Sequence, residues 1–309
     1  MRFTLPLLSL CAATPALCVN YTAPGYSAQK LYQLANSTWI SEIASPESSY
    51  EMRMTLFDRP DVYAVDPTHQ HGGPRSIHSF PDSYGLSAIT TLGYEEYGIL
   101  AMGQQNHSTF VSLWVLRLNG AEPEAVRVMD KIGNITALGA ITTLSETVVL
   151  ASQTAEGTVY RIDLVSREVE LVLRDPSRAK ALYGIHYRAP YLYYTNYDEG
   201  VFARMAIDPV TAAQRGAAEV IARSELLVGA DKFVLVDDGS ADDDVDAFIV
   251  NFKKNSLVRV RNGHAELVVQ GIVMPTTVQF GNGGGLYVAT ASEAGEMGAS
   301  LWSISTPDV

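Results

Sequence analysis

The sequence predicts an all-β protein, a six-bladed β-propeller whose four-stranded antiparallel blades surround a central pocket. A strand with the order small or polar, aliphatic, aromatic or aliphatic, any residue, aliphatic recurs six times. Its second positions are 51, 46, 42, 56 and 44 residues apart. A repeat of about 40 to 50 residues made of strands and turns is typical of propeller blades. The copies are Asp61–Val65, Ser112–Leu116, Thr158–Ile162, Gly200–Arg204 (which breaks the pattern at its last residue), Ser256–Val260 and Ser300–Ile304.

A second register supports the same number of blades. The innermost strands can be aligned on two hydrophobic residues separated by one residue, and the leading positions are 43, 52, 47, 48 and 45 residues apart. No window shows a helical period, and Gly- and Pro-rich turns separate the strands. The leading residues are Ile43, Leu86, Leu138, Ile185, Phe233 and Val278.

The chain divides into a leader at 1–18, an N-terminal extension at 19–38 and the propeller at 39–309. Arg2, an apolar run over Phe3–Ala13 and the small-x-small site Ala16-Leu17-Cys18 have the order of a cleaved signal peptide. The alternative is a retained anchor, but the run is shorter than the ~18 apolar residues of a membrane span. We expect the extension to lie along the surface or to supply an outer strand that closes the ring.

The two cysteines lie within the leader, so the mature chain is expected to lack disulfides, thiolate metal ligands and a cysteine nucleophile. Four Asn-x-Ser/Thr sequons predict glycosylation and a secreted or secretory-lumen protein. They begin at Asn20, Asn36, Asn106 and Asn134.

The formal net charge of −12 argues against nucleic acid and anionic lipid as partners. The densest acidic run, from Asp237 to Asp246, surrounds a Gly-Ser turn and lacks the residue order of a calcium loop. We interpret it as a solvated hairpin tip, with an ion site as the alternative.

In a propeller, the start of each innermost strand and the residue after each second strand lie on the same face. Twelve positions therefore form the predicted mouth of the central pocket: Ser41, Tyr84, Thr136, Tyr183, Asp231, Thr276, Asp58, Gln104, Gln153, Asn196, Asn251 and Thr290. A mouth rich in phenols, hydroxyls and neutral amides suits a hydrophobic, oxygen-bearing small molecule.

From residue 38 onward the chain resembles fungal secreted six-bladed propellers related to the SMP-30/gluconolactonase superfamily. The group includes fungal hetero-Diels–Alderases that join a tropolone quinone methide to a terpene, and the resemblance implies a similar activity. The motifs that carry it are Thr38–Ala44, Ile77–Pro81, Gly229–Leu235 and Met274–Phe280.

The resemblance also implies where a metal would bind. The lactonase branch holds a divalent cation with a glutamate, an asparagine and an aspartate, and the matching positions here are Ser41, Tyr183 and Asp231. One carboxylate beside a serine and a phenol is a poor site for a hard cation. Strand alternation points the adjacent Glu42 away from the channel unless a bulge intervenes. We therefore expect no metal and no other cofactor.

The candidate catalytic residues are Asp231 and Tyr183. A lone carboxylate deep in the mouth is poorly hydrated, which raises its pKa and suits it to proton transfer. The alternative is a carboxylate hydrogen-bonded to backbone N–H groups of the next blade. We expect Lys232 to point into the blade or along its rim. His186 is expected to face the blade interior, in a structural role or in proton transfer.

Nine further residues are predicted to bind substrate: Trp39, Ser41, Tyr84, Gln104, Thr136, Gln153, Asn196, Asn251 and Thr276. The hypothesis is a metal-independent cyclase or pericyclase of fungal secondary metabolism, which holds the reacting ends of its substrate at attack distance. Two alternatives remain, a metal-dependent lactonase or hydrolase and a non-catalytic secreted binding propeller.

Overall fold

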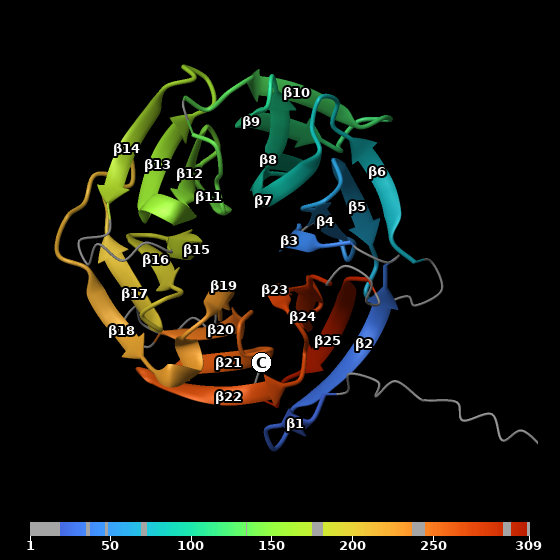
Figure 1. Cartoon of the computed structure of the whole chain (residues 1–309), viewed down its shortest axis with the longest axis vertical. Helices are drawn as coiled ribbons and strands as arrows, with labels where there is room; N and C mark the ends of the chain where they lie inside the picture. The colour runs from blue at the N-terminus through green and yellow to red at the C-terminus, as the bar shows by residue number, and fades with distance from the viewer. Residues whose placement is uncertain are drawn as a thin grey trace, which may run out of the picture.

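The computed structural model describes residues 19–34, 38–46, 49–68, 73–133, 135–174, 182–236, 245–292 and 298–307. They form six antiparallel sheets arranged around an axis, so the six-bladed propeller is confirmed (Figure 1). The expected leader, the sequons at Asn36 and Asn134, and nearly all of the acidic run lie outside the described residues.

Each of the first three blades has four strands in sequence order from the axis outward (Figure 1). Blade 1 contains β3 (Ile40–Ala44), β4 (Met52–Leu56), β5 (Asp61–Val65) and β6 (Arg75–Ser79). Blade 2 contains β7 (Gly85–Gly93), β8 (Glu96–Gln105), β9 (Ser108–Arg117) and β10 (Glu124–Met129). Blade 3 contains β11 (Ala140–Ser145), β12 (Val148–Gln153), β13 (Thr158–Asp163) and β14 (Val169–Arg174).

The other three blades follow the same plan. Blade 4 contains β15 (Leu182–Arg188), β16 (Tyr191–Asn196), β17 (Val201–Ala206) and β18 (Glu219–Arg223). Blade 5 contains β19 (Ala230–Leu235), β20 (Asp246–Asn251), β21 (Ser256–Arg261) and β22 (His264–Gln270). Blade 6 contains β23 (Pro275–Phe280), β24 (Leu286–Thr290) and β25 (Ser300–Ser305). Within the described ranges the helical elements are two 3-10 turns, η1 (Thr154–Glu156) and η2 (Glu225–Leu227).

The N-terminal extension closes the ring. Strand β2 (Ser27–Gln33) pairs with β25 and supplies the fourth strand of blade 6. Strand β1 (Tyr21–Thr22) pairs with β22 as a fifth strand of blade 5. Both lie at the outside of the ring in Figure 1. The extension therefore supplies outer strands, one of the two placements expected from the sequence, and it ties the first described residues to the last two blades.

The repeated five-residue pattern falls on the third strand of every blade. The alignment of the innermost strands holds in five blades and is wrong in one. Leu138 precedes β11, which begins at Ala140, because a turn in which the Ile135 N–H bonds to the Ile132 carbonyl delays that strand.

The hydrophobic core is divided into six clusters, and each cluster joins two neighbouring blades. Tyr97 and Phe80, for example, are buried between blades 1 and 2. Because the blades pack face to face, apolar side chains occupy both faces of the middle strands and the channel is left to the innermost strands.

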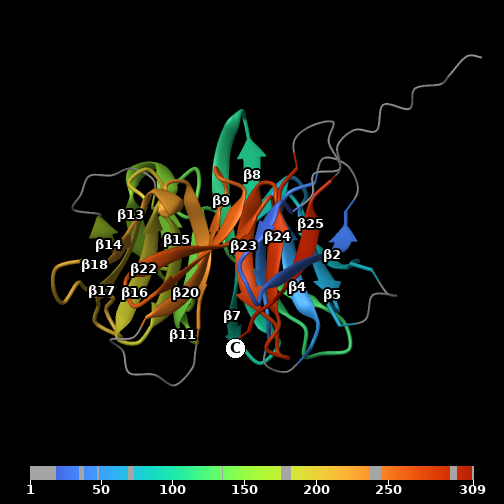
Figure 2. The ribbon, with the colours of Figure 1, turned by 90° about the horizontal axis from the view of Figure 1, so that it is seen from below.

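Blade 2 has the longest strands, and its β8–β9 hairpin projects beyond the rest of the ring (Figure 2). The turn carries Asn106 and His107, both at positive φ. Among the described residues there is no helix long and apolar enough to cross a membrane.

Candidate functional site

A β-bulge near the mouth end of the innermost strand is repeated in five blades. In blade 1 the pairing shifts between Ile40 and Glu42, and in blade 5 it shifts between Ala230 and Phe233. Equivalent shifts occur in β7, β15 and β23. An extra residue inverts the alternation of the side chains that follow it. The strands therefore present to the channel residues that simple alternation assigns to the blade interior.

This inversion corrects the expectations for Lys232 and His186, and it is the bulge that the sequence analysis named as the exception for Glu42. Glu42, Lys232 and His186 all line an axial cavity of about 250 Å³. Alternation without a bulge had turned Glu42 away from the channel and had placed Lys232 and His186 within or beside the blades. The channel thus contains a second carboxylate and an ammonium group besides Asp231.

Lys232 reaches from blade 5 to blade 1. Its Nζ donates a 2.8 Å hydrogen bond to the carbonyl oxygen of Ser41 and lies 3.3 Å from Glu42 Oε2. The same Oε2 atom accepts a 3.2 Å hydrogen bond from the backbone N–H of Ile89 in blade 2. This axial cluster of Glu42, Lys232 and Asp231 therefore connects three blades.

The carboxyls of the cluster have raised pKa values. Burial raises the pKa of Asp231 to about 7, the Lys232 charge opposes this, and the Glu42 charge adds to it. Burial also raises the pKa of Glu42, while Lys232 and the Ile89 N–H lower it. Asp231 is partly exposed to solvent. No hydrogen bond joins its carboxylate to the other described residues, so the alternative of a carboxylate held by neighbouring N–H groups is not seen.

Two aromatic groups lie at the mouth. Tyr183 stacks on Tyr197 with ring centroids 4.8 Å apart, and the Asp231 charge is among the causes that raise the pKa values of both phenols, after burial. On blade 1, Trp39 contacts Phe57 at 5.0 Å and stacks on Phe252 of blade 5 at 5.8 Å.

Phe57, Tyr197 and Phe252 were missed from the sequence. Each is the residue directly after the end of a second strand, β4, β16 or β20. The prediction chose Asn196 and Asn251 one residue earlier, and Asp58 one residue later. An aromatic residue repeated at that position in three blades is the signal that was available.

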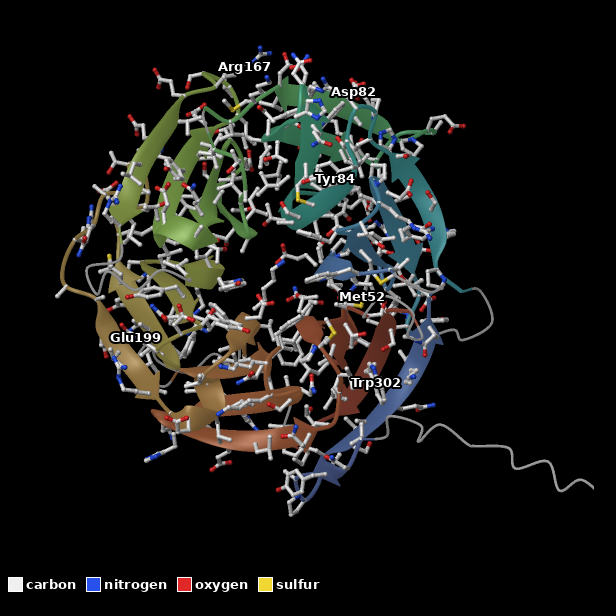
Figure 3. The ribbon with its side chains drawn as sticks, in the orientation of Figure 1. Met52, Asp82, Tyr84, Arg167, Glu199 and Trp302 are labelled. Atoms are coloured by element: carbon white, nitrogen blue, oxygen red, sulfur yellow. The ribbon has the colours of Figure 1, made fainter. Side chains whose placement is uncertain are left out.

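Three predicted residues are exposed beside the mouth. Tyr84 precedes β7, is 44% exposed, and lies nearer the axis than Asp82 in Figure 3. Thr136 is exposed in the loop before β11. Gln104 is exposed on the projecting β8–β9 hairpin, opposite Thr109. The structure therefore leaves the side chains of these three residues accessible.

Ser41 and Thr276 hold neighbouring blades together. Ser41 Oγ donates to the carbonyl oxygen of Leu86 at 2.7 Å, and Thr276 Oγ1 donates to the carbonyl oxygen of Ile40 at 2.6 Å. Both side chains are almost fully buried. Their hydroxyls thus serve blade-to-blade contacts rather than facing the mouth as free donors.

The predicted rim amides also have partners within the protein. Asn251 Nδ2 donates to two backbone carbonyls, and its Oδ1 accepts from the Lys254 N–H at 2.8 Å. Asn196 Oδ1 accepts from the Glu199 N–H. Gln153 Oε1 accepts from the hydroxyl of Tyr160. These three side chains stabilise turns and a strand pair, and they are poorly placed to bind substrate as the sequence predicted.

The cavity of about 250 Å³ lies toward the end of the channel opposite the mouth, because it is lined by later residues of the inner strands. We call it the lower cavity; its polar lining includes Glu42, Thr90, Thr142, His186, Lys232 and Gln279. Burial, with a smaller effect of Arg188, lowers the pKa of His186 to about 4. The imidazole is therefore neutral at physiological pH.

The residues at the axis do not fit the divalent-cation site that the lactonase resemblance implies. Two carboxylates are present, but the Lys232 ammonium lies against one of them. Within the described part of the chain no three His, Cys, Asp or Glu side chains gather as a metal site. A hard dication prefers several oxygen ligands and no adjacent positive charge.

Two of the predicted glycosylation sites lie in described segments. Asn20 and Asn106 are exposed, and Asn106 lies in the tight turn between β8 and β9. Their modification stays a prediction.

The comparisons with known proteins show the fold. No family model matches the chain, and no curated protein sequence matches it. A luciferin-regenerating enzyme superposes with a TM-score of 0.69 at 12% identity, covering 92% of this chain and 97% of the other. A calcium-binding regucalcin from Agrobacterium tumefaciens gives 0.65 at 12% identity, covering 91% and 95%. A streptogramin B lyase gives 0.56 at 11% identity, covering 91% and 97%.

These similarities show the six-bladed propeller fold and nothing finer. At such low identity they establish architecture, and function has to be argued from the site. The SMP-30/gluconolactonase, fungal and Diels–Alderase parts of the resemblance all stay predictions.

Proposed function

We propose that the protein is an enzyme that acts at the axial mouth, with Asp231 as general acid and base and Tyr183 beside it. The observation that carries the proposal is the position of one carboxyl among aromatic rings. The Asp231 charge acts on both phenols of the Tyr183–Tyr197 stack, and its pKa of about 7 allows it both to give and to take a proton near neutrality.

The surroundings support a hydrophobic substrate that bears oxygen. Trp39, Phe57 and Phe252 offer ring faces on one side of the mouth, and the phenol pair lies on the other. Rings of this kind stabilise conjugated or terpenoid carbon chains by apolar burial and stacking. Accordingly, the proposed reaction is metal-independent cyclisation, of the hetero-Diels–Alder type, in fungal secondary metabolism.

The chemistry needs one proton donor. Protonated Asp231 gives its proton to a leaving hydroxyl as the C–O bond breaks, and water departs. The carboxylate then takes the proton of the substrate's enol or phenol, which gives a conjugated quinone-methide-like product and restores the acid. A polyene held against the aromatic rings adds to that product, and proximity alone accounts for several kcal/mol of the barrier.

The direct test incubates the purified protein with a hydroxybenzyl-type quinone-methide precursor and a polyene, with and without chelator. We expect a cyclised product in both samples. Asp231→Asn should lower the rate by about 100-fold or more, the usual effect of losing a general acid. An Asp231→Asn protein that is folded and fully active contradicts the proposed role of this carboxyl.

A second candidate function is a metal-dependent lactonase or hydrolase. Glu42 brings a second carboxylate to the axis, as this function requires, but the Lys232 ammonium lies against it and opposes a dication. A lactone substrate assayed in the same way separates the two, because lactonase activity would be lost to chelator. Tight binding of either substrate without turnover would instead favour the alternative of a binding propeller.

A further inference from the structure

The strongest unassigned feature is the buried ammonium of Lys232. Its side chain leaves blade 5, crosses the axis and ends on two oxygens of blade 1. Lys232 is 7% exposed, and long charged side chains are rarely buried to this degree without a specific partner. The inference concerns the same site as the proposed function but is tested without substrate.

We propose that the Lys232 ammonium is the resident cation of the axial site. It occupies the position between Glu42 and the Ser41 carbonyl that a divalent ion would need, and its removal opens a cation site formed by Glu42 and the Ser41 carbonyl oxygen.

The first argument is geometric. The ammonium lies 2.8 Å from one backbone oxygen and 3.3 Å from one carboxylate oxygen. Calcium binds such oxygens at about 2.3 to 2.6 Å, so an ion held by these two atoms would overlap Nζ. The ammonium and a dication therefore exclude each other at this position.

The second argument is the backbone geometry that turns Glu42 and Lys232 toward the axis. The bulges in β3 and β19 turn Glu42 and Lys232 toward the axis. Gly184 of blade 4 makes this possible, since a Cβ there would lie 2.8 Å from the Asp231 carbonyl oxygen and 3.0 Å from the Cα of Lys232. The backbone is thus shaped to bring this part of β19 close to its neighbour.

The third argument is charge balance. Two carboxylates facing one channel carry two negative charges when both are ionised, and a single dication would neutralise them. One ammonium neutralises only one of them, and it lies against Glu42. Lys232 therefore balances half of the charge that a divalent ion would balance at this position.

The test titrates CaCl₂ and MnCl₂ into purified wild type, Lys232→Ala and Lys232→Gln, using calorimetry and the Mn²⁺ resonance signal. Lys253→Ala, an exposed lysine of the same blade, is the matched control. We expect no stoichiometric binding by wild type or control. Both Lys232 variants should bind one ion, and adding Glu42→Gln should weaken that binding by about tenfold or more.

Removal of a buried cation destabilises the fold, so melting temperature is measured with and without calcium. The variants should be stabilised by calcium in a concentration-dependent way, as expected for a ligand that binds the folded state. Stoichiometric binding by wild type that is lost in Asp231→Asn overturns the proposal. So does the failure of calcium to bind or to restore either Lys232 variant. Neither result depends on whether the cyclase activity exists.

Discussion

The hydroxyl of Thr195 donates a 2.6 Å hydrogen bond to the backbone carbonyl oxygen of Asp231. The same Oγ1 atom accepts a 3.0 Å bond from the backbone N–H of Gly184. A fully buried side chain of blade 4 thus fixes the backbone of the candidate acid in blade 5. Ser41, Ser152 and Thr276 make comparable bonds to the next blade elsewhere in the ring.

Thr195→Val should therefore lower the free energy of unfolding by about 1 to 3 kcal/mol, because it leaves two buried backbone groups without a partner. It should also lower activity by moving Asp231. Urea unfolding and the substrate assay measure the two effects.

Thr276→Val provides the matched control, because its hydroxyl makes a bond of the same length to the Ile40 carbonyl. A similar loss of stability is expected there without the same loss of activity. Equal activity losses in the two variants would show that the Thr195 bond has no special relation to Asp231.

The pH dependence of stability follows from the raised pKa of Asp231. The folded state binds this proton more tightly than the unfolded chain, whose Asp titrates near 4. The contribution is present below the unfolded pKa and is lost as the pH rises through about 7. The effect is at most about 4 kcal/mol, and partial solvent access reduces it. Urea unfolding from pH ~4 to ~8 should show stability falling with pH, with a smaller slope in Asp231→Asn.

The ring itself was predictable because each blade repeats one local pattern. The third strand of each blade has apolar residues on both faces, and these pack against the two neighbouring blades. The pattern is visible in the sequence at residues such as Val62 and Leu113. The innermost strands were placed correctly except near Leu138, where a turn rather than hydrophobic pattern decides where β11 begins.

The channel was less predictable, because its lining depends on bulges that leave no clear residue signal. One extra residue in β19 sends Lys232 to the axis, and one in β3 does the same for Glu42. Asn251 was misassigned for a different reason. Asparagine suits both ligand binding and turn stabilisation, and only the observed bonds show the second use. Asp231 and Tyr183 were both predicted to lie at the mouth, and in the structure the Asp231 charge acts on the Tyr183 phenol.

Gly184→Ala should disturb the axial cluster because its methyl group would lie 2.8 Å from the Asp231 carbonyl oxygen. We expect a loss of about 1 to 3 kcal/mol in unfolding free energy, together with reduced activity. Gly216→Ala is the control, since a Cβ there has nothing within 4 Å. A Gly184→Ala protein with wild-type stability and activity would mean that the inner strands of blades 4 and 5 adjust without cost.

Trp39 should report substrate binding through its fluorescence. The chain has three tryptophans, and the other two, Trp114 and Trp302, are buried within blades with their indole N–H groups bonded to serine hydroxyls. A hydrophobic ligand at the mouth should change the emission of wild type but not of Trp39→Phe. If the ligand changes the emission of Trp39→Phe as much as that of wild type, the ligand binds away from the mouth.

His186 should have no part in the pH profile near neutrality. Its pKa of about 4 keeps the ring neutral throughout the range in which Asp231 titrates. His186→Gln should therefore leave the apparent pKa of the rate in place, whereas a general acid at Asp231 makes the rate fall as the pH rises above about 7. The measurement is the rate as a function of pH in both proteins. If the apparent pKa of the rate shifts in His186→Gln relative to wild type, the proton that controls the rate belongs to the lower cavity and not to the mouth. His186 lines that cavity beside Lys232 and Glu42.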